Sequence, residues 1–106
     1  MKSREFTEDE IRQQFLDHVR VLVNYWDKEV SEHTQTERLS GLAFSILTTI
    51  DGYSTGLPAF ILAPCPHEDD KQFCINNEEN YYPENHESRV KCDIAGELHE
   101  LFYNAR

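Results

Sequence analysis

The sequence predicts a mainly helical protein with an N-terminal antiparallel helical hairpin, and three observations support this fold class. Two Thr-x-x-Glu segments, at Thr7 and at Thr34, are each followed by apolar residues at helical spacing. About four residues separate the two expected helices, which favours a hairpin. The length of 106 residues fits one domain over residues 1–106, with no internal repeat or linker.

The first helix is expected from about residue 7 to about residue 29. Thr7 and Glu10 can form a capping box, and the acidic first turn faces the positive end of the helix dipole. Steps of three, four and seven residues then make one broad apolar stripe, flanked by further apolar residues. The stripe and its flank consist of Ile11, Phe15, Val19, Leu22 and Trp26, with Leu16, Val23 and Val30 beside them.

The second helix is expected from its cap at Thr34 to a stop at Asp51 and Gly52, since glycine readily adopts the left-handed conformation after a helix. Its stripe consists of Leu39, Leu42, Ala43, Ile46, Leu47 and Ile50. Phe44 lies off this stripe, which indicates that the second helix is covered on more than one side. Tyr25 and Trp26 adjoin each other at the end of the first helix. One-sided burial does not cover all three, so we expect a homodimer.

The second half of the chain is less regular. Residues 57–63 form an apolar run that Pro58 restricts to an edge strand or an extended packing segment, and residues 89–92 are its one strand-like partner. An α+β class with a two-stranded element therefore stays open. We expect a short helix within residues 66–77 with Phe73 pointing inward, a polar loop over 76–87, and a C-terminal helix capped by Asp93 that buries Ile94, Ala95, Leu98, Leu101 and Phe102.

The composition excludes several classes of function. Twenty acidic residues against ten basic ones give a net charge of −10, which excludes direct nucleic-acid binding through phosphate neutralisation. The longest apolar run, residues 59–63, is too short to span a bilayer, and the N-terminus lacks the apolar region of a signal peptide. We therefore expect a cytoplasmic protein that does not bind membranes.

The cysteines do not predict a metal site. Cys65, Cys74 and Cys92 are expected to be reduced thiols that fill small gaps in the core. With His67 and His86 they offer zinc ligands, but their spacing is irregular and lacks paired, closely spaced cysteines. We expect no metal and no cofactor, and keep a small metalloprotein as the third functional hypothesis.

No catalytic motif is present, and we expect a non-enzymatic protein. His99 and Glu100 lack a second histidine four residues later, and no phosphate-binding glycine loop occurs. Cys92 at an expected helix N-terminus, with His67, His86 or His99 nearby, is the one loose constellation for nucleophilic chemistry.

The strongest candidate for binding is the acidic segment and the tyrosine pair after it. Seven acids and one base lie between His67 and Glu87, and such a strip can complement a basic partner. Adjacent tyrosines in a polar loop are typical of interfaces, although one could anchor the loop and the acids could form a solvated face. The candidate binding residues are His67, Glu68, Asp69, Asp70, Tyr81, Tyr82, Glu84 and Asn85.

Four segments carry a resemblance to known proteins: residues 39–44, 66–71, 79–85 and 92–101. They resemble small uncharacterised proteins encoded by bacteriophages and prophages, over roughly residues 8–102. The resemblance implies a phage-type accessory protein and transfers no active site.

The predicted function is therefore a binding protein that engages a host protein through its acidic, tyrosine-bearing surface, as a host-takeover or counter-defence inhibitor. The alternative is a protein that binds or sequesters a small, nucleotide-type ligand in a pocket between the hairpin and the loop of Tyr81 and Tyr82.

Overall fold

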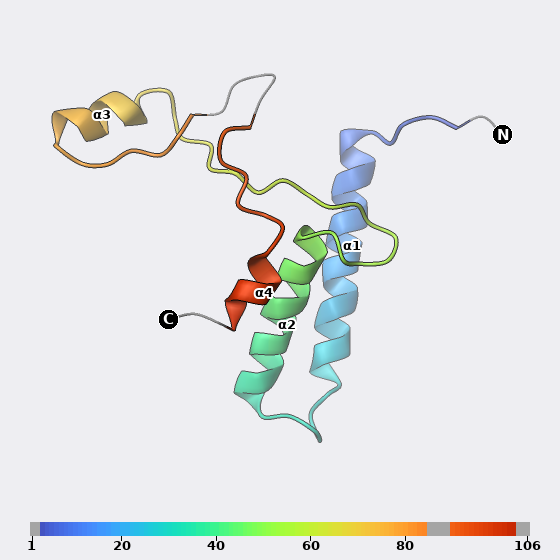
Figure 1. The fold of residues 1–106 in the computed structure, drawn as a ribbon. Coiled ribbons are helices and arrows are strands. Elements are labelled where there is room, and N and C mark those ends of the chain that lie inside the picture. Colours follow the sequence, from blue (N-terminus) through green and yellow to red (C-terminus); the bar gives the residue numbers. More distant parts are fainter. Residues whose placement is uncertain (1–2, 85–89, 104–106) are drawn as a thin grey trace.

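The chain is mainly helical, as predicted. The computed structural model describes residues 3–84 and 90–103. In chain order its helices are α1 (Glu8–Asp27), α2 (Gln35–Ile50), α3 (Asp70–Asn76) and α4 (Leu98–Phe102). Figure 1 shows α1 and α2 side by side as a hairpin, α4 against α2, and α3 at the end of a long projecting segment.

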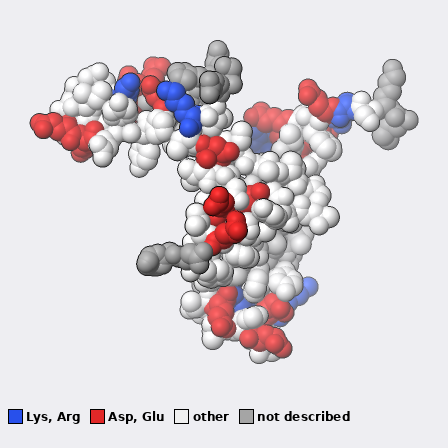
Figure 2. Space-filling model, viewed as in Figure 1, with Lys and Arg blue, Asp and Glu red and all other residues white. Residues whose placement is uncertain are grey.

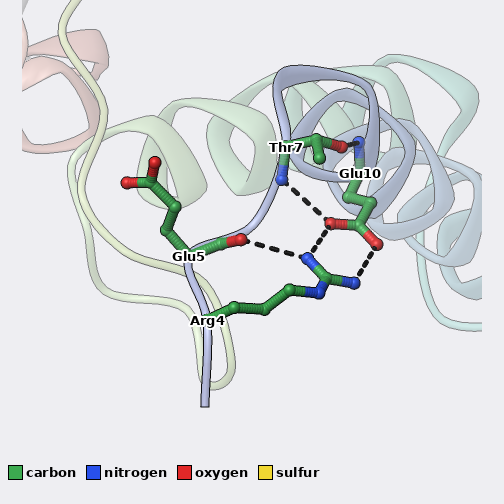
Figure 3. A network of polar contacts seen from close by, with 4 residues as sticks. All are labelled: Arg4, Glu5, Thr7 and Glu10. Atoms are coloured by element: carbon green, nitrogen blue, oxygen red, sulfur yellow. Dashed lines mark hydrogen bonds and ion pairs between the residues drawn. The ribbon is translucent and has the colours of Figure 1, made fainter. Parts of the chain in front are cut away.

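Both predicted capping boxes are confirmed. The Thr7 hydroxyl accepts a hydrogen bond from the Glu10 amide, and the Glu10 carboxylate accepts one from the Thr7 amide; Thr34 and Glu37 repeat the arrangement at the start of α2. In α1 the guanidinium of Arg4 also donates two hydrogen bonds of 2.9 Å to the Glu10 carboxylate (Figure 3). Arg4 first, and then the Thr7 amide, lower the pKa of Glu10 to about 2.

The hairpin is held by polar contacts as well as by its apolar stripes. The indole Nε1 of Trp26 donates to the hydroxyl of Ser45 at 3.0 Å. Its ring lies directly over Gly41, where an added Cβ would meet ring carbons at 2.5–2.7 Å. Glycine at this position therefore allows the close approach of the two helices.

The C-terminal helix docks on the end of α2 through a buried carboxylate. Asp51 was expected only as part of a helix stop, yet its side chain is fully buried and accepts hydrogen bonds from the amides of Gly96 and His99 at 2.6 and 2.8 Å. Phe44, which lies off the main stripe of α2, stacks against Tyr103 just after α4. The α2 helix is therefore covered on more than one side, as the position of Phe44 off its stripe indicates.

The C-terminal helix is shorter than predicted, because Asp93 does not cap it. Gly96 has a φ of +121°, a left-handed conformation that interrupts any helix from residue 94 onward, and α4 begins only at Leu98. The Asp93 carboxylate instead accepts hydrogen bonds from the amides of Leu62 and Ala95, both at 3.0 Å. Cys92 therefore does not lie at a helix N-terminus, and the prediction that it does is wrong.

We call residues 61–84 and 90–95 the arm. It leaves the hairpin after Phe60, carries α3, and returns to α4 (Figure 1). Within the described residues it contains no strand, so the predicted two-stranded element does not form there. One backbone hydrogen bond, from the Ile94 amide to the Leu62 carbonyl, joins its outgoing and returning segments. This contact falls after the predicted partner segment 89–92, of which residue 89 lies outside the described residues.

The prediction that Phe73 points inward is wrong. In the described chain α1 packs on α2 and α2 on α4, whereas α3 packs against no other helix. With nothing to cover it, the Phe73 side chain is 63% exposed.

The described residues contain no fully buried apolar side chain. The most enclosed residues are Gly41, Thr49 and Asp51, while the predicted stripe residues Ile11 and Leu39 are 39% and 60% exposed. The radius of gyration is 17.8 Å, against about 13 Å for a compact chain of this length. The sequence stripes are therefore present, but the chain alone covers them only in part.

None of the described helices is long and apolar enough to cross a membrane.

Candidate binding surface on the arm

The structure places seven of the eight predicted binding residues on the arm; the eighth, Asn85, lies outside the described residues. The acidic group lies at the start of α3, and the tyrosines lie after it, on the segment that leaves α3. Most of these side chains are exposed, and Glu84 is half-buried. The arm thus presents the predicted residues together at a distance from the hairpin (Figure 1).

The acidic group organises its own turn. The Asp70 carboxylate accepts a hydrogen bond from the His67 amide at 2.8 Å, and the Asp69 amide donates to Nδ1 of His67 at 3.1 Å. The Asp69 side chain makes no capping hydrogen bond at the N-terminus of α3. The imidazole of His67 and the carboxylates of Glu68 and Asp69 remain exposed.

The two tyrosines differ in their surroundings. Tyr81 is 47% exposed, and the ammonium of Lys71 lies 5.3 Å from the centre of its ring, a cation–π contact that ties this loop to α3. Tyr82 is 70% exposed. One tyrosine therefore anchors the loop, and the other offers most of its surface for contact.

On the face drawn in Figure 2, the acidic side chains do not form one continuous strip. In Figure 2 they lie at separate places, over the end of the arm, beside α4, near the start of α1 and at the turn of the hairpin, with large uncharged areas between. On this face the arm is therefore one of several places that carry acidic side chains.

Tyr82 lines a hollow on the arm. It has a volume of about 370 Å³ and is lined only by arm residues: Leu62, Ala63, Pro64, Tyr82, Pro83, Cys92 and Ile94. None of these residues belongs to α1 or α2, so this hollow does not lie between the hairpin and the loop. No charged side chain among the described residues lines this hollow, so it lacks the cation that a nucleotide phosphate needs.

The cysteines and histidines stay apart. Cys65 is exposed, and Cys74 and Cys92 are half-buried, all as free thiols, so the prediction that they fill a core is wrong for Cys65. Within the described ranges, no three His, Cys, Asp or Glu side chains converge to hold a metal ion. His86 lies outside these ranges.

The buried Asp51 and His99 pair is a feature that sequence reasoning missed. Nδ1 of His99 lies 2.5 Å from the Asp51 carboxylate, and the imidazole also packs against the rings of Phe44 and Tyr53. Burial alone would raise the pKa of this carboxyl. Hydrogen bonds from the side chain and amide of His99, and from the amides of Gly96 and Leu98, outweigh burial and lower the pKa to about 2.

A second polar cluster joins α1 to the end of α2. Nε2 of His18 lies 3.1 Å from the Thr49 hydroxyl and 3.3 Å from the Ser54 hydroxyl. Thr49 is 1% exposed and donates to the Ser45 carbonyl. In the described chain no carboxylate orients the His18 ring, so this cluster lacks the third member of a nucleophilic triad. It is a part-buried polar contact between α1 and the end of α2.

Comparisons of the chain with family models, with curated proteins and with solved structures find no match. The functional argument therefore depends on the residues of this chain.

Proposed function

We propose that the protein is a non-enzymatic binding protein whose arm engages another macromolecule, a host protein with a basic surface. The observation that carries this proposal is the exposed arm, which holds the acidic turn and Tyr82 away from the rest of the chain. A seven-residue helix is not stable alone, and α3 packs on no other described helix. Contact with a partner would supply the missing cover for Phe73.

The acidic turn and the tyrosine have different roles in this proposal. Exposed carboxylates such as Glu68 and Asp69 act at a distance, where they attract a basic partner and speed its association. Tyr82 acts on contact, since a tyrosine ring buries a large apolar area while its hydroxyl keeps a hydrogen bond. The partner would therefore combine basic side chains with an apolar patch.

The wider proposal follows the expectations from the sequence. The protein would be a phage-type accessory protein in the host cytoplasm, where binding inhibits a host or defence protein. It would act as a homodimer that carries two arms.

The first experiment isolates the charge of the arm. A partner captured from host extract is purified, and its association rate is measured over a series of salt concentrations. The triple variant Glu68→Gln, Asp69→Asn, Asp70→Asn should associate more slowly, with a weaker dependence on salt. The matched control, Glu5→Gln, Asp17→Asn, Glu32→Gln, changes the net charge equally away from the arm and should have a smaller effect.

The second experiment tests the contact residue. Tyr82→Ala should increase the dissociation rate and leave the association rate nearly unchanged. If the triple variant, its control and Tyr82→Ala all bind as the parent does, the arm is not the binding surface.

A further inference from the structure

One arginine of the hairpin lacks an acidic partner. Arg4, Arg12 and Arg20 each form an ion pair with a carboxylate. Arg38, half-buried on α2, forms no ion pair, and its guanidinium makes no hydrogen bond with a described residue. Its Nε is shielded from water and has no acceptor in the described chain. A buried donor without a partner is costly, so this position favours a ligand that supplies the acceptor.

Arg38 lines a groove that also contains one acidic side chain. The groove lies between α1 and α2 near the turn of the hairpin, has a volume of about 140 Å³, and is lined by Val23, Trp26, Asp27, Arg38, Leu39 and Leu42. Asp27 is exposed, and its carboxylate forms no ion pair or hydrogen bond with a described residue. The groove therefore holds two opposite charges that do not pair with each other.

Both charges stand at the helix end that disfavours them. Asp27 is the last residue of α1, where the helix dipole is negative, and no basic residue lies in that last turn. Arg38 is the fourth residue of α2, and its side chain leans towards the positive N-terminal end of the helix. Neither placement stabilises its helix, whereas a ligand that carries both charges would offset both.

The two charges together select a zwitterion. A bare carboxylate or phosphate at Arg38 would be repelled by Asp27, and a bare amine at Asp27 would be repelled by Arg38. A molecule that carries an ammonium beside a carboxylate suits both residues. The guanidinium would donate to its carboxylate, and the Asp27 carboxylate would accept from its ammonium.

The other walls of the groove are apolar, and the space is small. They consist of three aliphatic side chains and an indole: Val23, Leu39, Leu42 and Trp26. The volume of about 140 Å³ equals that of about five water molecules in the liquid, and pockets for drug-sized ligands have roughly 300–1,000 Å³. The ligand is therefore a small molecule whose one further part is a short apolar chain.

We propose that this groove binds a free α-amino acid with an aliphatic side chain, such as leucine. Its carboxylate would bind Arg38, its ammonium would bind Asp27, and its side chain would lie against Val23 and Leu39. An α-amino acid attaches all three groups to one carbon, so a single small molecule meets every part of the groove. This inference goes beyond the proposed function and does not involve the arm.

The first experiment uses the fluorescence of Trp26, the one tryptophan of the chain, which lines the groove. L-Leucine at millimolar concentration should change this fluorescence in a saturable way. Isocaproate, which is leucine without its amino group, and isoamylamine, which is leucine without its carboxylate, should each bind at least about 10-fold more weakly, because each lacks one charge-assisted hydrogen-bonding group. No saturable change with leucine, or equal binding of either analogue, would overturn the proposal.

The second experiment removes each charge of the groove. Arg38→Gln and Asp27→Asn should each weaken leucine binding at least about 10-fold. The matched controls are Arg20→Gln and Asp17→Asn, which remove the same charges from an exposed ion pair of α1 that lines no part of this groove. Both controls should bind leucine as the parent does. Binding that survives both groove substitutions would show that leucine binds elsewhere and would overturn the assignment.

Thermal unfolding separates the loss of a ligand site from the loss of the fold. Because each groove charge opposes its helix dipole, Arg38→Gln and Asp27→Asn should unfold at the parental temperature or slightly above it. If a variant fails to fold, the comparison of leucine with its two analogues on the unaltered protein still decides the proposal.

Discussion

The substitution Asp51→Asn tests whether one buried carboxylate holds α4 on the hairpin. Asparagine keeps the shape but replaces one acceptor oxygen with an NH₂ donor, so the side chain loses either its bond from Gly96 or its two bonds from His99. A hydrogen bond to a charged group contributes about 1.5–3 kcal/mol. We therefore expect α4 to dock less tightly by at least that amount.

Hydrogen exchange at the Leu101 amide measures this change. Leu101 donates to the Glu97 carbonyl within α4, and a helix of five residues does not persist once it leaves α2. Its exchange should accelerate about 10- to 150-fold, the equivalent of 1.5–3 kcal/mol. Asp17→Asn is the control, because the contacts of Asp17, an ion pair with Arg20 and a hydrogen bond from Gln13, are exposed and lie within α1.

Two results would refute this reasoning. If Leu101 exchanges at the parental rate in Asp51→Asn, α4 is held by its aromatic contacts and not by the carboxylate. If Asp17→Asn accelerates the exchange equally, the effect comes from the loss of any carboxylate.

Three further predictions concern pH, packing and capping. The folded-state pKa of Asp51 is about 2, against 3.8 for an unperturbed group. The contribution of its carboxylate to stability is therefore full above about pH 4 and is lost as the pH falls towards 2. A pH titration followed by near-UV circular dichroism should show a transition between these pH values that Asp51→Asn lacks. Gly41→Ala should destabilise the hairpin by about 1–3 kcal/mol, because the added methyl group clashes with the Trp26 ring. Thermal unfolding followed by tryptophan fluorescence measures this, and a gain in stability would contradict the close packing of Trp26 on Gly41. Thr34→Ala should cost about 0.5–2 kcal/mol in urea unfolding, and Thr36→Ala, which removes no cap, should cost less.

The hairpin could be predicted from the sequence because its signals are local. The contacts of a capping box join residues three apart, such as Thr34 and Glu37, so the sequence pattern contains the whole interaction. The stop at Gly52 is equally local, and its φ of +95° confirms the reason for it. Only the bounds changed, by about two residues at the end of α1.

The docking of α4 could not be predicted, because its contacts are distant in sequence. Asp51 and Gly96 are 45 residues apart, and no spacing rule relates a helix stop to a left-handed glycine so far away. The exposure of Phe73 was missed for another reason: periodicity shows which side of a helix is apolar and gives no information on whether anything packs there. The grouping of the candidate binding residues on one arm could not be predicted either, because it depends on where α3 lies relative to the hairpin.

The arm begins and ends at a single point of the hairpin. Where the arm leaves, the Phe60 amide donates a hydrogen bond of 2.9 Å to the Ile50 carbonyl. Where it returns, the amides of Gly96 and His99 donate to the carboxylate of Asp51, the residue that follows Ile50. The arm therefore leaves the hairpin and returns to it at one place, and doubling the length of a loop closed in this way costs only about 0.6 kcal/mol of closure entropy. A segment whose two ends are held at one place can be lengthened or exchanged for another sequence. A new binding specificity in the arm would therefore require no change in the helices of the hairpin.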